Sequence, residues 1–193
     1  MDLKTLKTFS LAGALFLCCA VFAGAVSAQP APKQYVADFG AAFTQATVTK
    51  ARMGMLGLDL SVGKMIIDGL SVGIAVGHDV VSYRKNGEIH ERLAIVPILA
   101  KAKYYYAIAP SMSLHASVAG GGYQTIPHLG TDEIGGVSRA EIKPGAGIGL
   151  GFDYWLFGSH GFGVEFEYHF IDTGGEDLFS YCAARLNYSI IKM

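Results

Sequence analysis

The chain has 193 residues, with 15 basic and 16 acidic side chains, so its formal net charge is −1. This balance excludes the basic surface that binds nucleic acid, and we expect no nucleic-acid partner. The length suits a single domain, three cysteines are too few for a disulfide-rich secreted module, and 25 glycines are unusual for an ordinary soluble sheet.

Residues 1–28 have the pattern of an export signal: two lysines near the start, a long uncharged stretch, and small residues before Gln29. An uncleaved membrane anchor is the alternative, since about 18 apolar residues would span a bilayer. We predict cleavage after Ala28, because the small residues give way abruptly to a Pro-containing, flexible lead-in over 29–34. The mature chain then keeps one cysteine, Cys182, and cannot form an intramolecular disulfide.

From residue 35 onward, apolar and polar side chains alternate in one segment after another. Because successive side chains of a strand point to opposite faces, this period of two predicts strands with one apolar and one polar face. In chain order the predicted strands cover about 35–46, 52–62, 69–83, 91–107, 112–124, 139–154, 161–171 and 178–191. Asn86–Gly87 is a hairpin signal between the third and fourth strands. Pro97 in the fourth strand requires a position without a ladder donor, at a bulge or a strand start.

The segment 161–171 shows the alternation most clearly, with Phe166 and Tyr168 on one parity and Glu165 and Glu167 on the other. A basic residue that faces lipid at the bilayer midplane costs about 2–4 kcal/mol, and an acidic residue somewhat less. The apolar parity therefore faces lipid, and the polar parity faces an enclosed interior. Aromatic residues near the strand ends predict girdles at the membrane interfaces. These residues are Tyr35, Tyr83, Tyr104, Tyr105, Tyr106, Tyr123, Tyr154, Trp155 and Tyr188.

Eight strands of about the length that a tilted membrane strand needs can close into a barrel. We predict an all-β fold, an eight-stranded antiparallel up-and-down transmembrane β-barrel over residues 35–193 that follows the cleaved signal peptide. An even number of strands places both ends of this domain on the periplasmic side. The external connections are then near 47–51, 84–90, 125–138 and 173–177, and the periplasmic turns near 63–68, 108–111 and 155–160.

The inward parity carries charges of both signs. An eight-stranded barrel has an interior just wide enough for side chains to fill, and an isolated buried charge is costly, so we expect these charges to pair into a network that plugs the lumen. The expected members are Asp38, Asp59, Asp79, Lys101, Lys103, His115, Lys143, Asp153, Glu165, Glu167, His169 and Arg185. The many inward glycines could instead enlarge the bore, which keeps a narrow passive channel open as an alternative.

Several of these stretches resemble a known family. Val96–Tyr106 leads into Leu114–Tyr123, and the glycine-alternating run 145–154 leads into 163–168. They are similar to the small eight-stranded outer-membrane β-barrel proteins of Gram-negative bacteria, loosely called porin-family or OmpA/OmpX/OmpW-like. The resemblance implies an architecture rather than an activity, because this family includes anchors, adhesion factors, small channels and lipid-modifying enzymes. Its members usually end on an aromatic residue, whereas this chain ends at Met193.

Motifs for catalysis are weak. Barrel enzymes that act on lipid A need a hydroxyl, a base and an acid within hydrogen-bond reach, and the candidates are Ser159–His160 and His169 with Asp172 and Thr173. The His-x-Ser spacing associated with the barrel deacylases is absent after His169. The histidines are scattered without metal-ligand spacing, and the Gly-x-Gly run at 145–151 has a strand period rather than that of a nucleotide fingerprint. We therefore predict no enzyme, no metal and no cofactor.

The sequence thus predicts an integral protein of the cell outer membrane with a structural or surface-interaction role. Its expected partners are outer-membrane lipid and, during biogenesis, the barrel-assembly machinery, and we expect a monomer. Besides the passive channel and the lipid A-modifying enzyme, a soluble lipocalin-like barrel in the periplasm stays open. That last fold would invert the faces, with apolar side chains inside and charges outside.

Overall fold

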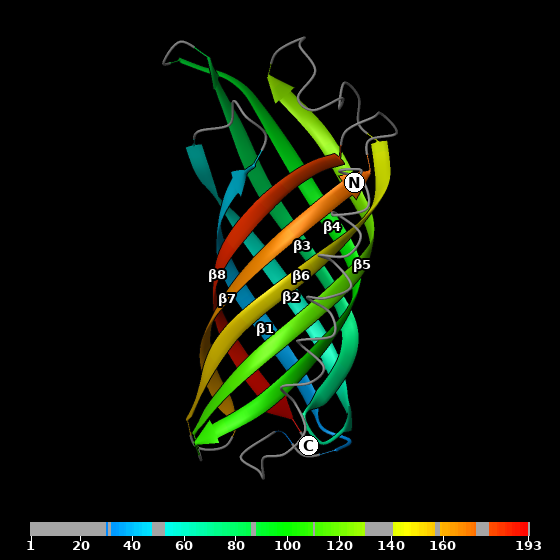
Figure 1. Cartoon of the computed structure of the whole chain (residues 1–193), viewed down its shortest axis with the longest axis vertical. Helices are drawn as coiled ribbons and strands as arrows, with labels where there is room; N and C mark the ends of the chain where they lie inside the picture. The colour runs from blue at the N-terminus through cyan, green and yellow to red at the C-terminus, as the bar shows by residue number, and fades with distance from the viewer. Residues whose placement is uncertain are drawn as a thin grey trace, which may run out of the picture.

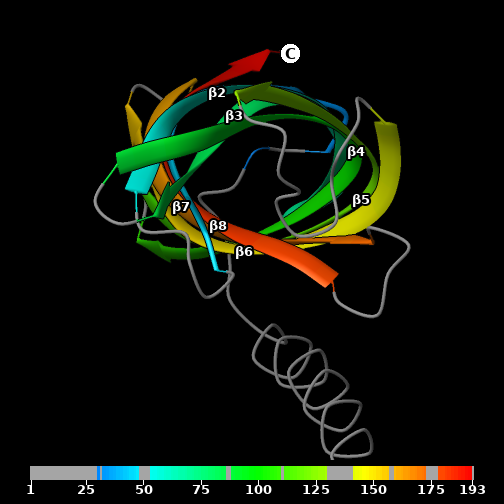
Figure 2. The same ribbon diagram turned by 90° about the horizontal axis from the view of Figure 1, so that it is seen from above.

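The computed structural model describes residues 30, 32–47, 53–85, 88–109, 111–129, 141–156, 159–172 and 178–192. Eight strands form a closed barrel in which each strand pairs antiparallel with its sequence neighbours and the first pairs with the last, as Figures 1 and 2 show. The strands are β1 Tyr35–Ala46, β2 Met53–Ile67, β3 Leu70–Lys85, β4 Glu88–Ala109, β5 Met112–Leu129, β6 Glu141–Leu156, β7 His160–Asp172 and β8 Leu178–Lys192. The predicted all-β, eight-stranded antiparallel barrel is confirmed.

Both ends of the barrel domain lie at the same end of the barrel, because Tyr35 of β1 pairs with Lys64 of β2 and with Lys192 of β8. We call this end, which also holds the connections after β2, β4 and β6, the turn end; the opposite end is the loop end. The connections at the loop end include the longest, between Leu129 and Glu141. Short periplasmic turns and longer external loops are typical of outer-membrane barrels.

Some strand limits differ from the prediction. β2 continues to Ile67, so the turn predicted near 63–68 is shorter, and β5 continues to Leu129 into the predicted loop 125–138. The reason is that the alternation continues there: Met65 is buried inside while Lys64 is exposed outside. The predicted signal peptide and most of the predicted external connections lie outside the described residues and stay predictions. Residues 30 and 32–34 of the lead-in are described, and Lys33 and Gln34 form backbone hydrogen bonds with Met65. Among the described residues, none forms a helix that is long and apolar enough to cross a membrane.

The two faces of the barrel wall have opposite character. Phe166 is 65% exposed outside while its neighbour Glu165 is 1% exposed inside, and Leu186 and Arg185 show the same contrast at 68% and 2%. Large apolar side chains cover the outside on all eight strands, and the buried set includes most of the described charged residues of the strands. A soluble lipocalin-like barrel requires the reverse arrangement, so this alternative is wrong.

Pro97 lies in the middle of β4, at an interruption of its ladder with β3, and not at the bulge or strand start that the sequence predicted. The pairing of β3 with β4 passes from Val76 opposite Ile98 to Asp79 opposite Ile95, with no pair between. Proline has no N–H group to donate to a ladder. The barrel therefore accommodates this proline by omitting the pairs that it would break.

Candidate functional site

The lumen holds an ionic layer that joins strands from opposite sides of the barrel. Lys101 of β4 lies 3.0 Å from Glu165 and 2.7 Å from Glu167, both on β7 (Nζ to Oε1 in each case). The alternation of each strand positions them, because residues two apart point to the same side. These side chains are almost fully buried, so each charge depends on its partners rather than on water.

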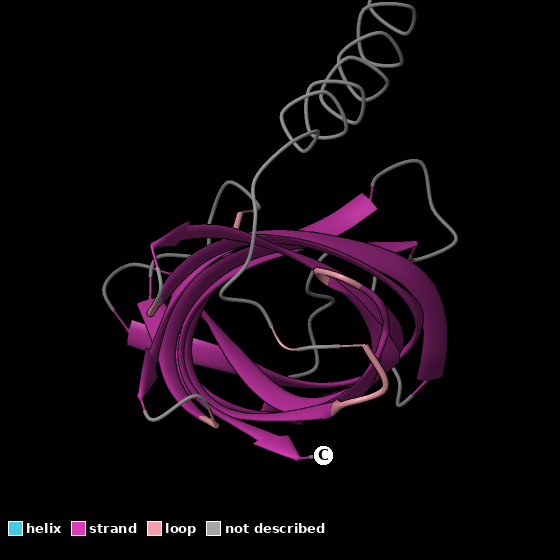
Figure 3. Cartoon of the chain, turned by 90° about the horizontal axis from the view of Figure 1, so that it is seen from below, coloured by secondary structure: helices cyan, strands magenta, loops and turns pink. Residues whose placement is uncertain are grey.

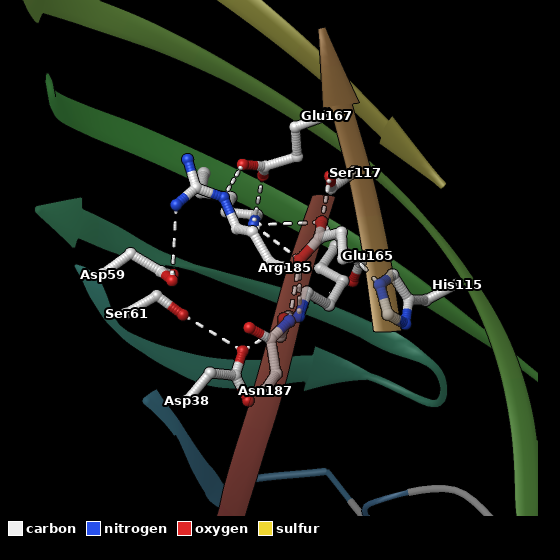
Figure 4. Close-up of polar contacts among 12 residues, drawn as sticks. Asp38, Asp59, Ser61, His115, Ser117, Glu165, Glu167, Arg185 and Asn187 are labelled. Atoms are coloured by element: carbon white, nitrogen blue, oxygen red, sulfur yellow. Dashed lines mark hydrogen bonds and ion pairs between the residues drawn. The ribbon is translucent and has the colours of Figure 1, made fainter. Parts of the chain in front are cut away.

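Arg185 of β8 is the second centre of this layer. Its Nε donates to Glu167, its Nη2 lies 3.2 Å from Asp79 of β3, and its Nη1 lies 3.3 Å from Asp59 of β2. Figure 4 shows Glu167 and Asp59 approaching the guanidinium from different strands. One arginine therefore connects four strands, as its planar set of several donors allows.

Lys103 is the next inward residue after Lys101 on β4, and it joins the layer to β1. Its Nζ donates to Asp38 of β1 at 2.9 Å and lies 3.6 Å from Glu165. The hydroxyl of Ser61 also donates to Asp38, at 3.0 Å. Asp38 therefore has two donors from two different strands.

Two histidines extend the layer toward the two ends of the barrel. His115 contacts Asp153 at 2.6 Å through Nδ1, and its Nε2 lies 3.7 Å from Glu165. His169 contacts Glu167 at 3.3 Å through Nε2 and the Tyr123 hydroxyl at 2.9 Å through Nδ1. Both imidazole rings are buried inside the barrel. The His115 ring lies on the turn-end side of Glu165, and the His169 ring lies on the loop-end side of Glu167.

All predicted site residues except Lys143 join one connected set of ion pairs and hydrogen bonds: Asp38, Asp59, Asp79, Lys101, Lys103, His115, Asp153, Glu165, Glu167, His169 and Arg185. Lys143 instead pairs with Glu141 at 2.6 Å, with both side chains partly exposed. It lies two residues from the loop-end start of β6, where its long side chain reaches water, so placing it in the lumen network was wrong.

Neutral polar residues complete the set, and the prediction omitted them. The Ser117 hydroxyl donates to Glu165 at 2.7 Å, the Asn187 amide donates to Glu165 at 3.3 Å, and the Tyr181 hydroxyl donates to Asp79 at 2.9 Å. Each of them shares the inward parity of its strand. That parity was the available signal for including them.

Side chains of neighbouring strands lie close above two inward glycines of β6. A Cβ added to Gly147 would lie 2.8 Å from His169 Nδ1, and one added to Gly149 would lie 2.9 Å from Glu165 Oε1. Both distances are shorter than an ordinary van der Waals contact. These glycines of β6 therefore provide room for the bulky polar residues of β7.

Apolar clusters lie on both sides of the ionic layer. Toward the turn end, Val36, Met65, Tyr105 and Trp155 pack together, and the Trp155 indole donates to Ser113 at 2.9 Å. The cluster toward the loop end consists of Ala46, Val81, Leu93, Ile95, Leu99, Tyr123, Ile171, Phe179 and Tyr181. We call these the turn-end cluster and the loop-end cluster.

The interface girdle predicted for the aromatic residues is wrong for Tyr105, Tyr123 and Trp155, which are buried inside the barrel at 1%, 0% and 6% exposure. All three occupy the inward parity of their strands, and parity rather than nearness to a strand end decides the face. Tyr35 and Tyr154 lie outside, at 50% and 40% exposure.

A cavity of about 10 Å³ lies between β1, β2, β3 and β4, and its lining includes Asp38, Ser61, Lys101 and Lys103. This volume is about that of one water molecule. It is much smaller than the space that a hydrated ion or a small solute would need.

The two histidines considered for catalysis lie on opposite faces of β7. His160 contacts the Tyr188 hydroxyl at 2.7 Å near the turn end, while His169 contacts Glu167 and Tyr123 inside. Thr173 lies outside the described residues. Within the described part of the chain, no group of three or more His, Cys, Asp or Glu side chains is arranged to hold a metal ion.

Solved structures share this architecture. Neisserial surface protein A (NspA) has a TM-score of 0.60 at 14% identity, over 81% of this chain and 96% of its own. Ail, the attachment invasion locus protein of Yersinia pestis, has a TM-score of 0.55 at 13% identity, over 83% of this chain and 99% of its own. OprG from Pseudomonas aeruginosa has a TM-score of 0.55 at 14% identity, over 84% and 95%.

The chain has the fold of the small outer-membrane β-barrels. No family model matches the sequence, and no curated protein sequence matches it. At identities of 13–14% the likeness shows the fold alone. The predicted location in the outer membrane agrees with this fold and with an outer wall of exposed apolar side chains, which water would disfavour and acyl chains would cover.

Proposed function

We propose that this outer-membrane barrel has a structural or surface-interaction role and that its lumen is closed to ions and solutes. The observation that carries the proposal is the pairing of Lys101 with Glu165 and Glu167, which crosses the lumen between non-adjacent strands. Opening a path would require separation of buried ion pairs, which is strongly unfavourable once either partner loses its counter-charge.

The clusters at the two ends support closure. A hydrated ion that entered from the turn end would first meet Tyr105 and Trp155, whose rings lie 6.2 Å apart between centroids. At the other side of the ionic layer it would meet Leu93, Ile95 and Phe179 of the loop-end cluster, each at most 1% exposed. Removing water from an ion against apolar side chains is costly, so these layers act as two further barriers.

A surface-interaction role is supported by the uneven length of the strands. β4 has 22 residues and β5 has 18, whereas β1 has 12, and about 9–11 residues suffice to cross a membrane. The β3–β4 hairpin extends beyond β1 and β2 at the loop end in Figure 1. Such an extension offers a surface outside the membrane. Two of the similar structures are, by name, a surface protein and an attachment invasion locus protein.

We also propose that the chain is not an enzyme and that it is a monomer that the barrel-assembly machinery inserts. His169 is enclosed by Glu167 and Tyr123, away from the lipid boundary where an acyl chain would lie. Mass spectra of lipid A from cells with and without the protein test this part. Unchanged spectra are expected, and a shift of one acyl chain would contradict it.

Planar-bilayer recording of the refolded mature protein tests closure. The expected result is no conductance steps above the bare bilayer, with heat-modifiable gel migration as the control that the barrel has folded. Replacing Lys101, Glu165 and Glu167 by alanine removes the ionic layer but leaves the two end clusters in place. A heat-modifiable variant is therefore expected to conduct only when Trp155 and Phe179, one from each cluster, are replaced by alanine as well. Regular steps from the unmodified protein would favour the passive channel and overturn the closed lumen.

A further inference from the structure

Three lysines gather on the outer wall at the turn end. Tyr35 pairs with Lys64 on one side and with Lys192 on the other, so these residues form one row across β2, β1 and β8. Tyr35, Lys64 and Lys192 are exposed, and each lies on the outward parity of its strand. Neighbouring strands are about 4.8 Å apart, so the two lysine backbones flank Tyr35 at a separation of about 10 Å.

The third lysine is held beside the row by the backbone. The N–H of Lys33 donates to the carbonyl of Met65 at 3.0 Å, and the N–H of Met65 donates to the carbonyl of Gln34 at 2.8 Å. Lys33 is exposed, and these hydrogen bonds place its backbone beside Met65, the chain neighbour of Lys64. The Lys64 ammonium lies 5.8 Å from the centroid of the Tyr35 ring, a cation–π distance that orients it.

Among the described residues, these cations have no acidic partner in an ion pair. Within the described residues, no ion pair includes Lys33, Lys64 or Lys192, while Asp68 in the β2–β3 turn is an exposed acid at the same end. At the loop end the outward position 172 of β7 carries an exposed acid instead. At the turn end the described surface thus carries three exposed lysines and one exposed acid.

The row lies at the depth of lipid headgroups. The next outward residues toward the membrane centre are Val62, Ala37 and Ile190, which pair across the same three strands, and Val62 is 42% exposed. An exposed lysine at an interface costs only about 0–1 kcal/mol, compared with about 2–4 kcal/mol at the midplane. Figure 3 views this end, where β8 finishes at the edge of the ring. Amines at the rim above an apolar wall match a phosphate joined to acyl chains.

We propose that Lys33, Lys64 and Lys192 bind the phosphate of an anionic phospholipid of the periplasmic leaflet, whose acyl chains lie against the wall formed by Val62, Ala37 and Ile190. The contact is electrostatic at the rim and apolar along the wall. Each lysine near a phosphate contributes enough to change binding about fivefold.

Native mass spectrometry of the folded mature protein, released from micelles that contain equal amounts of phosphatidylglycerol and phosphatidylcholine, tests this site. We expect retained phosphatidylglycerol in excess of phosphatidylcholine. Lys64→Gln and Lys192→Gln are each expected to lower the retained phosphatidylglycerol about fivefold. Lys64→Arg is expected to keep it, because the charge remains.

Two matched variants serve as controls. Lys143→Gln removes a lysine at the loop end, and Asp68→Asn removes the acid at the turn end, so neither is expected to lower retention. Equal retention of both lipids by the unmodified protein, or unchanged retention by Lys64→Gln and Lys192→Gln, would overturn the proposal. So would a loss of retention that depends on Lys143 rather than on the rim. Heat-modifiable migration confirms folding of each variant, and the result does not depend on whether the lumen conducts.

Discussion

Lys101 of β4 and Glu167 of β7 meet in the middle of the lumen, with 2.7 Å between Nζ and Oε1, although neither strand pairs with the other. Hydrogen bonds of the ladder join only neighbouring strands, whereas this contact joins strands across the ring. The buried ion pairs therefore brace the barrel in a direction that the backbone cannot.

Removal of the Lys101 charge should destabilise the barrel strongly. Lys101→Met removes one of the two cations that contact each of Glu165 and Glu167. Breaking buried pairs in this way costs about 3–5 kcal/mol. Urea unfolding in lipid vesicles measures the change. The control Lys143→Met, at a partly exposed pair, is expected to change stability by less than about 1 kcal/mol. Equal effects of the two substitutions would contradict the bracing role.

Two ion pairs of similar length but different burial should differ in coupling. Lys103 and Asp38 lie 2.9 Å apart with side-chain exposures of 4% and 6%, whereas Lys143 and Glu141 lie 2.6 Å apart with exposures of 21% and 47%. Double-mutant cycles are expected to give about 1–3 kcal/mol for the buried pair and about 0.2–1 kcal/mol for the exposed pair. A larger coupling for Lys143–Glu141 would argue against burial as the cause.

Addition of one methyl group to a lumen glycine should be harmful. The new Cβ of Gly149→Ala would meet Ser117 and Glu165, and such overpacking costs about 1–3 kcal/mol. Gly63→Ala is the matched control, because it also lies on the inward parity and the nearest atoms to its added Cβ, those of the Ser71 side chain, are 3.5 Å away. The comparison of unfolding midpoints checks this, and a stable Gly149→Ala barrel would mean that the lumen has spare room.

Fluorescence of the single tryptophan, Trp155, can show whether its side chain lies inside the barrel or against lipid. Trp155 is 6% exposed and lies inside, so brominated lipids should quench its fluorescence weakly. Moving the indole by one position, with Trp155→Phe and Tyr154→Trp together, places it on the outer wall, where Tyr154 is 40% exposed. Strong quenching is expected for that variant. Strong quenching of the unmodified protein would instead return Trp155 to the lipid interface.

Alternation in the sequence was sufficient to assign the faces of Glu165 and Phe166, and hence the architecture and most of the inward charges. It was less informative at strand ends. Lys143 follows the inward parity, but its position near the end of β6 gives it access to water and to Glu141. Trp155 was assigned by its residue type rather than its parity, and the parity was the better guide.

The partners of each charge could not be predicted. The contacts of Arg185 with Asp59 and Asp79 join β8 to β2 and β3, and they depend on closure of the ring and on the register of every strand. Alternation gives the face of a residue but not its height in the barrel. The apolar clusters at the two ends were missed for a related reason, since Ile171 follows the same parity as Glu167 but lies at the loop end.

The gap in the ladder at Pro97 has a consequence for amide exchange. A closed barrel has no edge strand, so its amide protons are protected all around except where a pair is missing. The backbone of β3 between Val76 and Asp79 faces that gap. Amides of β3 and β4 beside this gap are therefore expected to exchange with solvent before their paired neighbours in the same two strands.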